Sequence, residues 1–154
     1  MDERIIANLK WPPQEKEIKT IDRFNQPSGN IHLISVKDYT FYSNPILSYG
    51  GNDKLLTPED FLLISLSSCQ FMTFYSIAVK AKLGLIYYED NSELFLAGDK
   101  IKFAEKILLN LKMKFEAPQP FEKVMELCHK AHKYCIIGNS IKSEIEFKLE
   151  LLQS

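Results

Sequence analysis

The stretch LTPEDFLLISLSSCQFMTFYSIAVKAKLG, residues 56–84, decides the fold of this chain. It opens with an N-cap, a proline suited to the first helical position, and two acidic residues that favour the positive end of a helix dipole: Thr57, Pro58, Glu59 and Asp60. Asp60, three residues after Thr57, completes an approximate capping box. Gly84 is a plausible stop signal. We therefore expect a helix from about residue 58 to about residue 82.

This expected helix is apolar on nearly every side between Phe61 and Tyr75, and Cys69 lies in its middle. A helix that is apolar all round must be buried on all sides. One sheet can cover only one face of it, so a single chain of this size cannot bury it fully. A second copy could cover the rest, and we expect an obligate homodimer wrapped around these helices.

The flanking segments indicate strands and one further helix. Residues 17–49 are typical of short strands, with the turn signal NQPSGN at 25–30. Residues 107–115 and 141–151 alternate apolar and polar side chains with the period of a strand. A second helix with apolar residues spaced three and four apart begins near Pro120. This order of strands and helices along the chain predicts an α+β fold, with the helices packed on antiparallel sheet.

Size and charge narrow the function classes. A length of 154 residues predicts one domain, residues 1–154, in which residues 1–16 are a possible N-terminal arm. A net charge of -1 argues against a nucleic-acid partner. Charged residues interrupt the apolar runs and the N-terminus lacks the apolar block of a signal peptide, so we expect no membrane span and a cytoplasmic protein. In that compartment three cysteines favour reduced, catalytic or metal-binding roles.

The start of the expected central helix and the spacing of two cysteines make the chain resemble the OsmC/Ohr family. Members of this family are thiol-dependent peroxidases that reduce organic hydroperoxides. Thr57-Pro58-Glu59 resembles the (T/N)PE start of the family's central helix, and Cys69 follows ten residues after Glu59. Cys135 lies at the end of the second expected helix, in YCIIGNSI before the last strand. The resemblance covers residues 20–152 and implies an intertwined α+β homodimer.

The resemblance also implies site residues. Cys69 corresponds to the reactive thiol, and Cys135 to the thiol that forms a disulfide with it. The family uses an arginine to steady the thiolate, and Arg23 can take that role with Glu59 as its carboxylate partner.

The sequence departs from the family pattern next to both cysteines. Ile136 stands where the family usually has proline, and Gln70 stands where it often has phenylalanine.

The implied chemistry needs a thiolate, because the thiolate is the nucleophile. Burial in an apolar pocket raises a thiol pKa, so a cation must offset that cost. Attack on the peroxide O–O bond releases an alcohol and leaves a sulfenic acid at Cys69, with which Cys135 condenses. An external thiol or dithiol then reduces the disulfide, and neither a cofactor nor a metal is needed.

Helix geometry places Glu59 away from the thiol of its own chain. Ten residues of straight helix rise about 15 Å, and ten steps of about 100° leave the two side chains on different faces. If Glu59 serves an active site, we expect it to serve the one built around Cys69 of the other subunit, with Arg23 between them.

Alternatives follow from the same residues. A cysteine in an apolar helix is often only a small core residue, which is also our interpretation of Cys128. Cys128, His132 and Cys135, with Cys69 from the other helix, could supply a Cys3His zinc site, although the spacing is not a common one. A dimer that keeps the fold without the chemistry, or that binds a small molecule, is the third possibility.

Overall fold

The computed structural model describes residues 4–11 and 31–153. The chain forms two compact units, Met1–Phe61 and Leu62–Ser154. The expectation of one domain over residues 1–154 stays a prediction.

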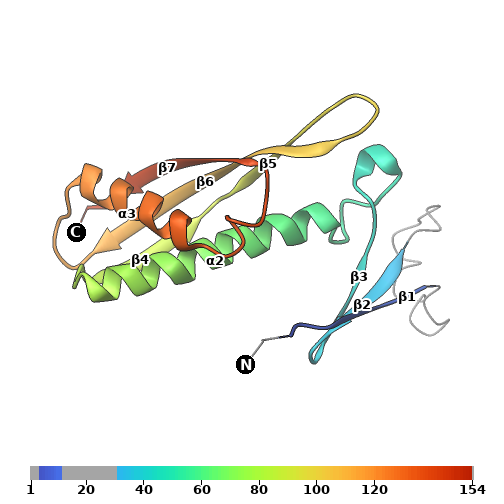
Figure 1. Cartoon of the computed structure of the whole chain (residues 1–154), viewed down its shortest axis with the longest axis horizontal. Helices are drawn as coiled ribbons and strands as arrows, with labels where there is room; N and C mark the ends of the chain where they lie inside the picture. Colours follow the sequence, from blue (N-terminus) through green and yellow to red (C-terminus); the bar gives the residue numbers. More distant parts are fainter. Residues whose placement is uncertain (1–3, 12–30, 154) are drawn as a thin grey trace. The chain divides into compact units, whose positions relative to one another are not determined.

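The first unit holds a small antiparallel sheet in the order β1-β2-β3. Its strands are β1 (Ala7–Lys10), β2 (His32–Val36) and β3 (Tyr39–Ser43), followed by a short 3-10 helix, η2 (Leu47–Tyr49) (Figure 1). Strands expected within residues 17–49 are thus confirmed for β2 and β3, and the expected turn at 25–30 lies outside the described residues. Part of the possible N-terminal arm forms β1.

The long helix α2 (Pro58–Lys80) begins as its sequence predicts. The Asp60 carboxylate accepts hydrogen bonds from the Thr57 amide at 2.8 Å and the Thr57 hydroxyl at 2.9 Å, and the Asp60 amide donates to the Thr57 hydroxyl oxygen at 3.2 Å. These reciprocal bonds form the capping box. The helix ends two residues earlier than expected, and Gly84 follows it with φ 65°.

A four-stranded sheet organises the second unit around its longest strand, β6 (Phe103–Phe115). On one edge β6 pairs antiparallel with β4 (Leu85–Asp90) and β5 (Glu93–Ala97). On the other it pairs with β7 (Glu144–Leu151), and this pairing is parallel instead of the expected antiparallel. The reason is the intervening helix α3 (Phe121–Tyr134), which carries the chain back across the sheet, as parallel neighbours require.

Both helices pack on one face of this sheet. Alternate β6 residues point into a common core: Ile107, Leu109, Leu111, Met113 and Phe115. Helix α3 adds Val124, Cys128 and Ala131 to it, and α2 adds a stripe of buried residues spaced four apart, Leu66, Gln70, Phe74 and Ala78. The opposite sheet face carries the ion pairs Lys106–Glu146 and Lys112–Glu150. The result is the two-layer α+β arrangement expected from sequence.

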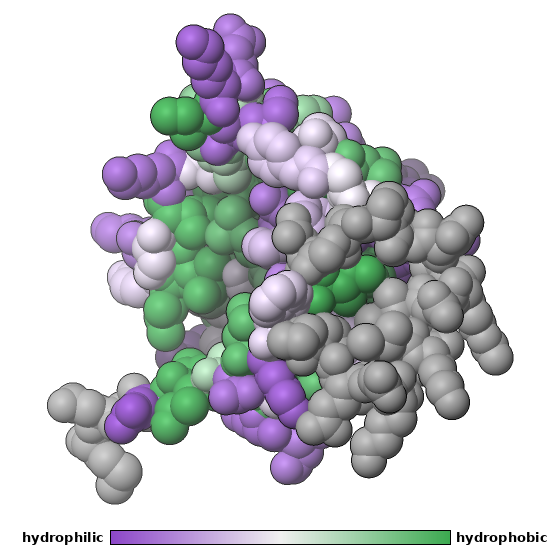
Figure 2. Space-filling model, turned by 90° about the vertical axis from the view of Figure 1, so that its right-hand side faces the viewer, coloured by the Kyte–Doolittle hydropathy of each residue, from purple (hydrophilic) through white to green (hydrophobic). Residues whose placement is uncertain are grey.

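Only that one stripe of α2 is buried within the chain. On its outward side large apolar side chains are exposed, Met72 and Val79 at 58% each, with Ile64 and Tyr75 beside them. Figure 2 shows hydrophobic side chains (green) exposed among hydrophilic ones (purple) on the face it presents. Exposed apolar surface of this kind is typical of interaction sites.

By length and composition alone, α2 could also cross a membrane, which corrects the expectation that charged residues leave no such segment. The same test is passed by core helices of soluble proteins, and the buried stripe of α2 is packed against β6 and α3.

Candidate active site

Two helices of the second unit bring Cys69 and Cys135 together. Cys69 lies in the middle of α2, and Cys135 is the C-cap residue of α3. Both are free thiols, and the Cys135 side chain is hydrogen-bonded to the Cys69 sulfur. Cys69 and Cys135, which the family resemblance assigns to one disulfide, therefore lie next to each other.

The environment of Cys69 favours its thiolate. Burial by itself would raise the pKa of this thiol. Four hydrogen bonds act in the other direction, from the Cys135 side chain, the backbone amides of Ile137 and Ile136, and the Thr73 hydroxyl, and the net result is a lowered pKa. Donors that point at the sulfur stabilise its charged form more than its neutral form. Cys69 is also partly exposed, so a reactant can reach it.

The environment of Cys135, in contrast, disfavours its thiolate. Burial and the hydrogen bond to Cys69 raise the pKa of Cys135 to about 11. Its position at the C-terminus of α3 acts in the same direction, because the negative end of a helix dipole disfavours an anion. The Gly138 amide donates to the Cys135 sulfur at 3.3 Å and offsets part of this effect. Burial and the position at a helix C-terminus thus both disfavour the Cys135 thiolate and make Cys69 the more acidic thiol of the pair.

The turn after Cys135 is fixed by its own hydrogen bonds. Asn139 donates twice to the Cys135 carbonyl oxygen, from its amide at 3.0 Å and from Nδ2 at 2.8 Å. His132 packs so closely on Gly138 that a Cβ there would lie 2.7 Å from its ring, so a larger residue would displace the His132 side chain. These contacts set where the amides of the turn point.

Cys128 takes no part in this pair. It is fully buried, and burial raises its pKa to about 12. Its carbonyl oxygen accepts a hydrogen bond from Nε2 of buried Gln70 at 3.0 Å, which joins α3 to α2. Cys128 is thus a core residue, as expected.

The zinc alternative finds no support in the described part of the chain, where no three His, Cys, Asp or Glu side chains are grouped so that they could hold a metal ion. His132 is occupied with apolar neighbours. Its ring lies against Phe147 with a centroid separation of 6.0 Å, and burial, followed by the nearby His129, lowers its pKa.

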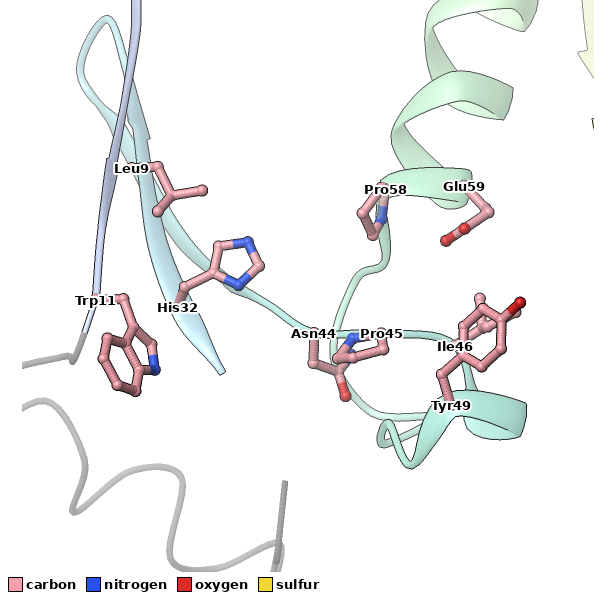
Figure 3. A pocket seen from close by; sticks show the side chains of 9 residues that line it. All are labelled: Leu9, Trp11, His32, Asn44, Pro45, Ile46, Tyr49, Pro58 and Glu59. Atoms are coloured by element: carbon pink, nitrogen blue, oxygen red, sulfur yellow. The ribbon is translucent and has the colours of Figure 1, made fainter. Parts of the chain in front are cut away.

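Glu59 belongs to the first unit, where it lines a cavity of about 490 Å³ (Figure 3). Leu9 and His32 line the cavity from the small sheet, and Tyr49 and Glu59 from the other side. The Glu59 Oε2 atom is buried and has no hydrogen-bond partner among the described residues.

Glu59 is not brought to the thiol pair of its own chain. Ten residues of α2 separate Glu59 from Cys69, a rise of about 15 Å. Arg23 lies outside the described residues, so its predicted role stays a prediction.

Sequence reasoning missed the donors around Cys69 that come from Thr73, Ile136 and Ile137. Thr73 was detectable, because it lies four residues after Cys69 and therefore one turn along the same helix face. Its single hydroxyl proton is donated to the Cys69 carbonyl oxygen at 2.8 Å, and its effect on the Cys69 pKa is the smallest of those named. The backbone amides carry no residue-type signal and could be recognised only from the fold of the turn.

A model of the family described as OsmC-like protein matches residues 51–150, which include α2, the sheet and both cysteines of the pair. The chain belongs to the OsmC-like protein family. A search of the curated proteins finds no match.

Solved structures of OsmC-like proteins share the fold along nearly the full chain. An OsmC-like protein of unknown function from Vibrio cholerae is 22% identical with a TM-score of 0.80, over 97% of this chain and 100% of its own. An organic hydroperoxide resistance protein from Elizabethkingia anophelis is 17% identical with a TM-score of 0.71, over 100% and 99%. The organic hydroperoxide resistance protein OhrB of Bacillus subtilis is 16% identical with a TM-score of 0.62, over 97% and 98%. At these identities the likeness shows the OsmC-like fold alone.

Proposed function

We propose that this OsmC-like protein is a thiol-dependent peroxidase that reduces organic hydroperoxides, with Cys69 as the attacking thiolate and Cys135 as the resolving thiol. The observation that carries the proposal is the pair itself, two free thiols of which Cys69 is partly exposed in the middle of α2 and Cys135 is fully buried at the end of α3. A peroxidase needs this difference, because one thiol must attack while the other waits. Some solved proteins of the same fold are named organic hydroperoxide resistance proteins.

The reaction starts when the Cys69 thiolate attacks the terminal oxygen of the hydroperoxide. The O–O bond breaks, Cys69 becomes a sulfenic acid, and the alkoxide leaves as an alcohol after taking a proton. Cys135 is the nearest proton donor, and losing that proton makes it a thiolate beside the sulfenic sulfur. Its attack forms the Cys69–Cys135 disulfide and expels hydroxide, which takes a proton from the solvent buffer and leaves as water.

An external thiol or dithiol completes the cycle by two-electron exchange with the disulfide. The protein needs no resident cofactor, because the electrons come from this reductant. Attack is favoured at the sulfur whose partner leaves more easily, and the lower pKa makes Cys69 the better leaving thiolate. We therefore expect the reductant to form its mixed disulfide with Cys135, which is fully buried in the dithiol form and must be uncovered for this step.

The functional unit in this proposal is a homodimer in the cytoplasm. Supporting it are the exposed apolar side chains of α2, which a second copy would cover. In the dimer, Glu59 would serve the thiol pair of the other chain together with Arg23. The unpartnered buried Oε2 atom of Glu59 supports this, since a buried carboxylate oxygen needs a donor.

Single-turnover reduction of an alkyl hydroperoxide by the reduced protein tests these roles. Cys69→Ser should abolish the reaction. Cys135→Ser should keep one turnover and then over-oxidise at Cys69, because no resolving thiol remains. The matched control is Cys128→Ser, which replaces the third cysteine and should keep repeated turnover with a dithiol. Equal, complete loss of the first turnover in the Cys69 and Cys135 variants would contradict the assignment. No turnover by the wild type with any alkyl hydroperoxide would favour a non-catalytic or small-molecule-binding OsmC-like dimer instead.

A further inference from the structure

A cavity of about 420 Å³ lies in the second unit, between α2 and the end of β4 (Figure 1). Its walls are apolar. They consist of Leu63, Ile64 and Phe71 from α2, with the Tyr88 ring next to Phe71 at a centroid separation of 4.9 Å. Cavities of about 300–1,000 Å³ with apolar walls and a few convergent polar groups are typical of small-molecule sites.

Asp90, at the end of β4, gives this cavity a polar end. Its Oδ2 atom accepts two hydrogen bonds, from the Ser67 hydroxyl at 2.5 Å and from the Ser92 hydroxyl at 2.6 Å. Its Oδ1 atom is buried and has no hydrogen-bond partner among the described residues. Neither ion pair of the described part of the chain includes Asp90. A buried carboxylate oxygen needs a donor, and these residues do not supply one.

The polar end of the cavity favours a ligand that donates hydrogen bonds. A serine hydroxyl has a single proton, and Ser67 and Ser92 both give theirs to Asp90. Their oxygens can therefore only accept further hydrogen bonds, as can Oδ1 of Asp90. An ammonium group carries three donors and a positive charge, which match three acceptors of which one is a carboxylate oxygen. The carboxylate would repel an anion, and an alcohol could supply one donor only.

The cavity is separate from the thiol pair. Ser67 precedes Cys69 by two residues, and two steps of about 100° place their side chains on opposite flanks of α2. Met72 and Val79, the most exposed apolar residues of α2, do not line the cavity, whereas Ile64 does. Its opening therefore lies at the edge of the surface that the proposed homodimer would cover.

We propose that this cavity binds a small molecule with a primary ammonium group on a short apolar chain. The ammonium group donates to Oδ1 of Asp90 and to the two serine oxygens, and the apolar chain lies against Leu63, Ile64 and Phe71. A free amine is favoured over a basic side chain of another copy, because the cavity has the volume of a ligand pocket and lies off the centre of the exposed α2 surface. The site uses neither thiol and is independent of the proposed peroxidase function.

The experiment is a titration of the reduced full chain with n-hexylamine, followed by the backbone amide shifts in NMR spectra. The shifts should be confined to residues that line the cavity, such as Ser67, Phe71 and Ser92. Hexylamine should bind about tenfold more tightly than 1-hexanol, because a charged hydrogen bond contributes more than a neutral one, and hexanoate should not bind. Equal affinities for amine and alcohol would overturn the proposal. If water alone satisfies Asp90, hexylamine will not bind, and the proposal fails.

Asp90→Asn tests the carboxylate directly. The amide keeps the shape of the side chain and an oxygen for the two serine hydroxyls but removes the charge, so the affinity for hexylamine should fall about tenfold. The matched control is Asp99→Asn, which removes the same charge from the exposed turn after β5 and should keep the wild-type affinity. An equal loss in both variants would show non-specific attraction and overturn the site.

Sedimentation of Asp90→Asn distinguishes a free ligand from a second copy. The variant should form the same oligomer as wild type at the same concentration. A weaker dimer, together with a wild-type protein that does not bind hexylamine, would overturn the proposal in favour of a basic side chain of the second copy. The comparison of hexylamine with hexanol uses wild-type protein and decides the question even if the variant does not fold. No measurement uses a peroxide, so a failure of the peroxidase assay is a separate outcome.

Discussion

Cys135 caps α3, where the helix dipole places partial negative charge, whereas Cys69 lies inside α2, far from either helix end. The acidity of Cys69 therefore depends on donors that arrive from outside its own helix. One of them is the thiol of Cys135 itself. The resolving residue thus has a role before any peroxide is present, since it helps to keep the first thiol ionised.

This coupling predicts that removing the Cys135 thiol weakens Cys69. In Cys135→Ala the pH midpoint of iodoacetamide alkylation at Cys69 should rise by about one pH unit, because a hydrogen bond to the thiolate is lost. A higher pKa leaves less thiolate at neutral pH, so the reaction at pH 7 should slow. Cys135→Ser should show a smaller rise, since a hydroxyl can still donate. Equal midpoints for Cys135→Ala and wild type would show that Cys135 does not support the thiolate.

For the candidate site, the sequence identified the reactive side chains but not the backbone groups that surround them. The pairing of Cys69 with Cys135, and not with Cys128, followed from the family resemblance, and the structure brings those two thiols together. The amides of Ile136 and Ile137 could not be foreseen, because every residue except proline carries one. Their use depends on the direction of a turn that tertiary packing sets.

Between elements, Gln70 is the polar link that joins α2 to α3 inside the core. Its Nε2 atom donates to the Cys128 carbonyl oxygen at 3.0 Å, while its Oε1 atom is buried without a partner in the described structure. The residue type that departs from the family pattern thus forms a helix-to-helix contact directly after Cys69.

We predict that Gln70→Ala lowers the free energy of unfolding by about 1–3 kcal/mol, since it loses the bond and leaves a cavity. Gln70→Met should cost less, because it fills the same space and removes the unpaired oxygen. Urea unfolding of the two variants beside wild type measures both values. If Gln70→Met is as destabilising as Gln70→Ala, the hydrogen bond matters more than the packing.

Secondary structure was predictable where local chemistry decides it. The capping box of Thr57 and Asp60 marked the start of α2 correctly, and alternation located β6 and β7. The direction of β7 was missed, because alternation is the same in parallel and antiparallel strands, although the helix expected between β6 and β7 permits a parallel crossover. The membrane-length composition of α2 was overlooked, although no charged residue lies between Asp60 and Lys80.

For the whole molecule, the exposed apolar side of α2 is the largest feature that one chain leaves unexplained. Met72 and Val79 are each 58% exposed there, although Phe74 and Ala78, on another face of the same helix, are buried. The homodimer proposed above would cover this side and could also bring Glu59 to the thiol pair of the other chain.

A mixed dimer tests that arrangement. Sedimentation should first show a dimer at micromolar concentration. Chains with Glu59→Ala and chains with Cys69→Ser should each be weakly active or inactive alone, whereas their mixed dimer keeps both wild-type residues at one composite site. About half of the wild-type activity per dimer should then return. No recovery above the parent variants would place both residues in one chain's site, or show that Glu59 only starts α2.

The parallel pairing of β7 with β6 has a consequence for how the chain is made. Residues 106–113 of β6 find their second neighbour only in residues 144–151, on the far side of α3. While a ribosome is still synthesising α3, β6 presents an unpaired edge and the part of its apolar face that α3 later covers, the combination that recruits other strands. An mRNA truncated before the codon for Glu144 would therefore yield an aggregation-prone fragment. Nascent chains would need protection from aggregation until their last strand emerges.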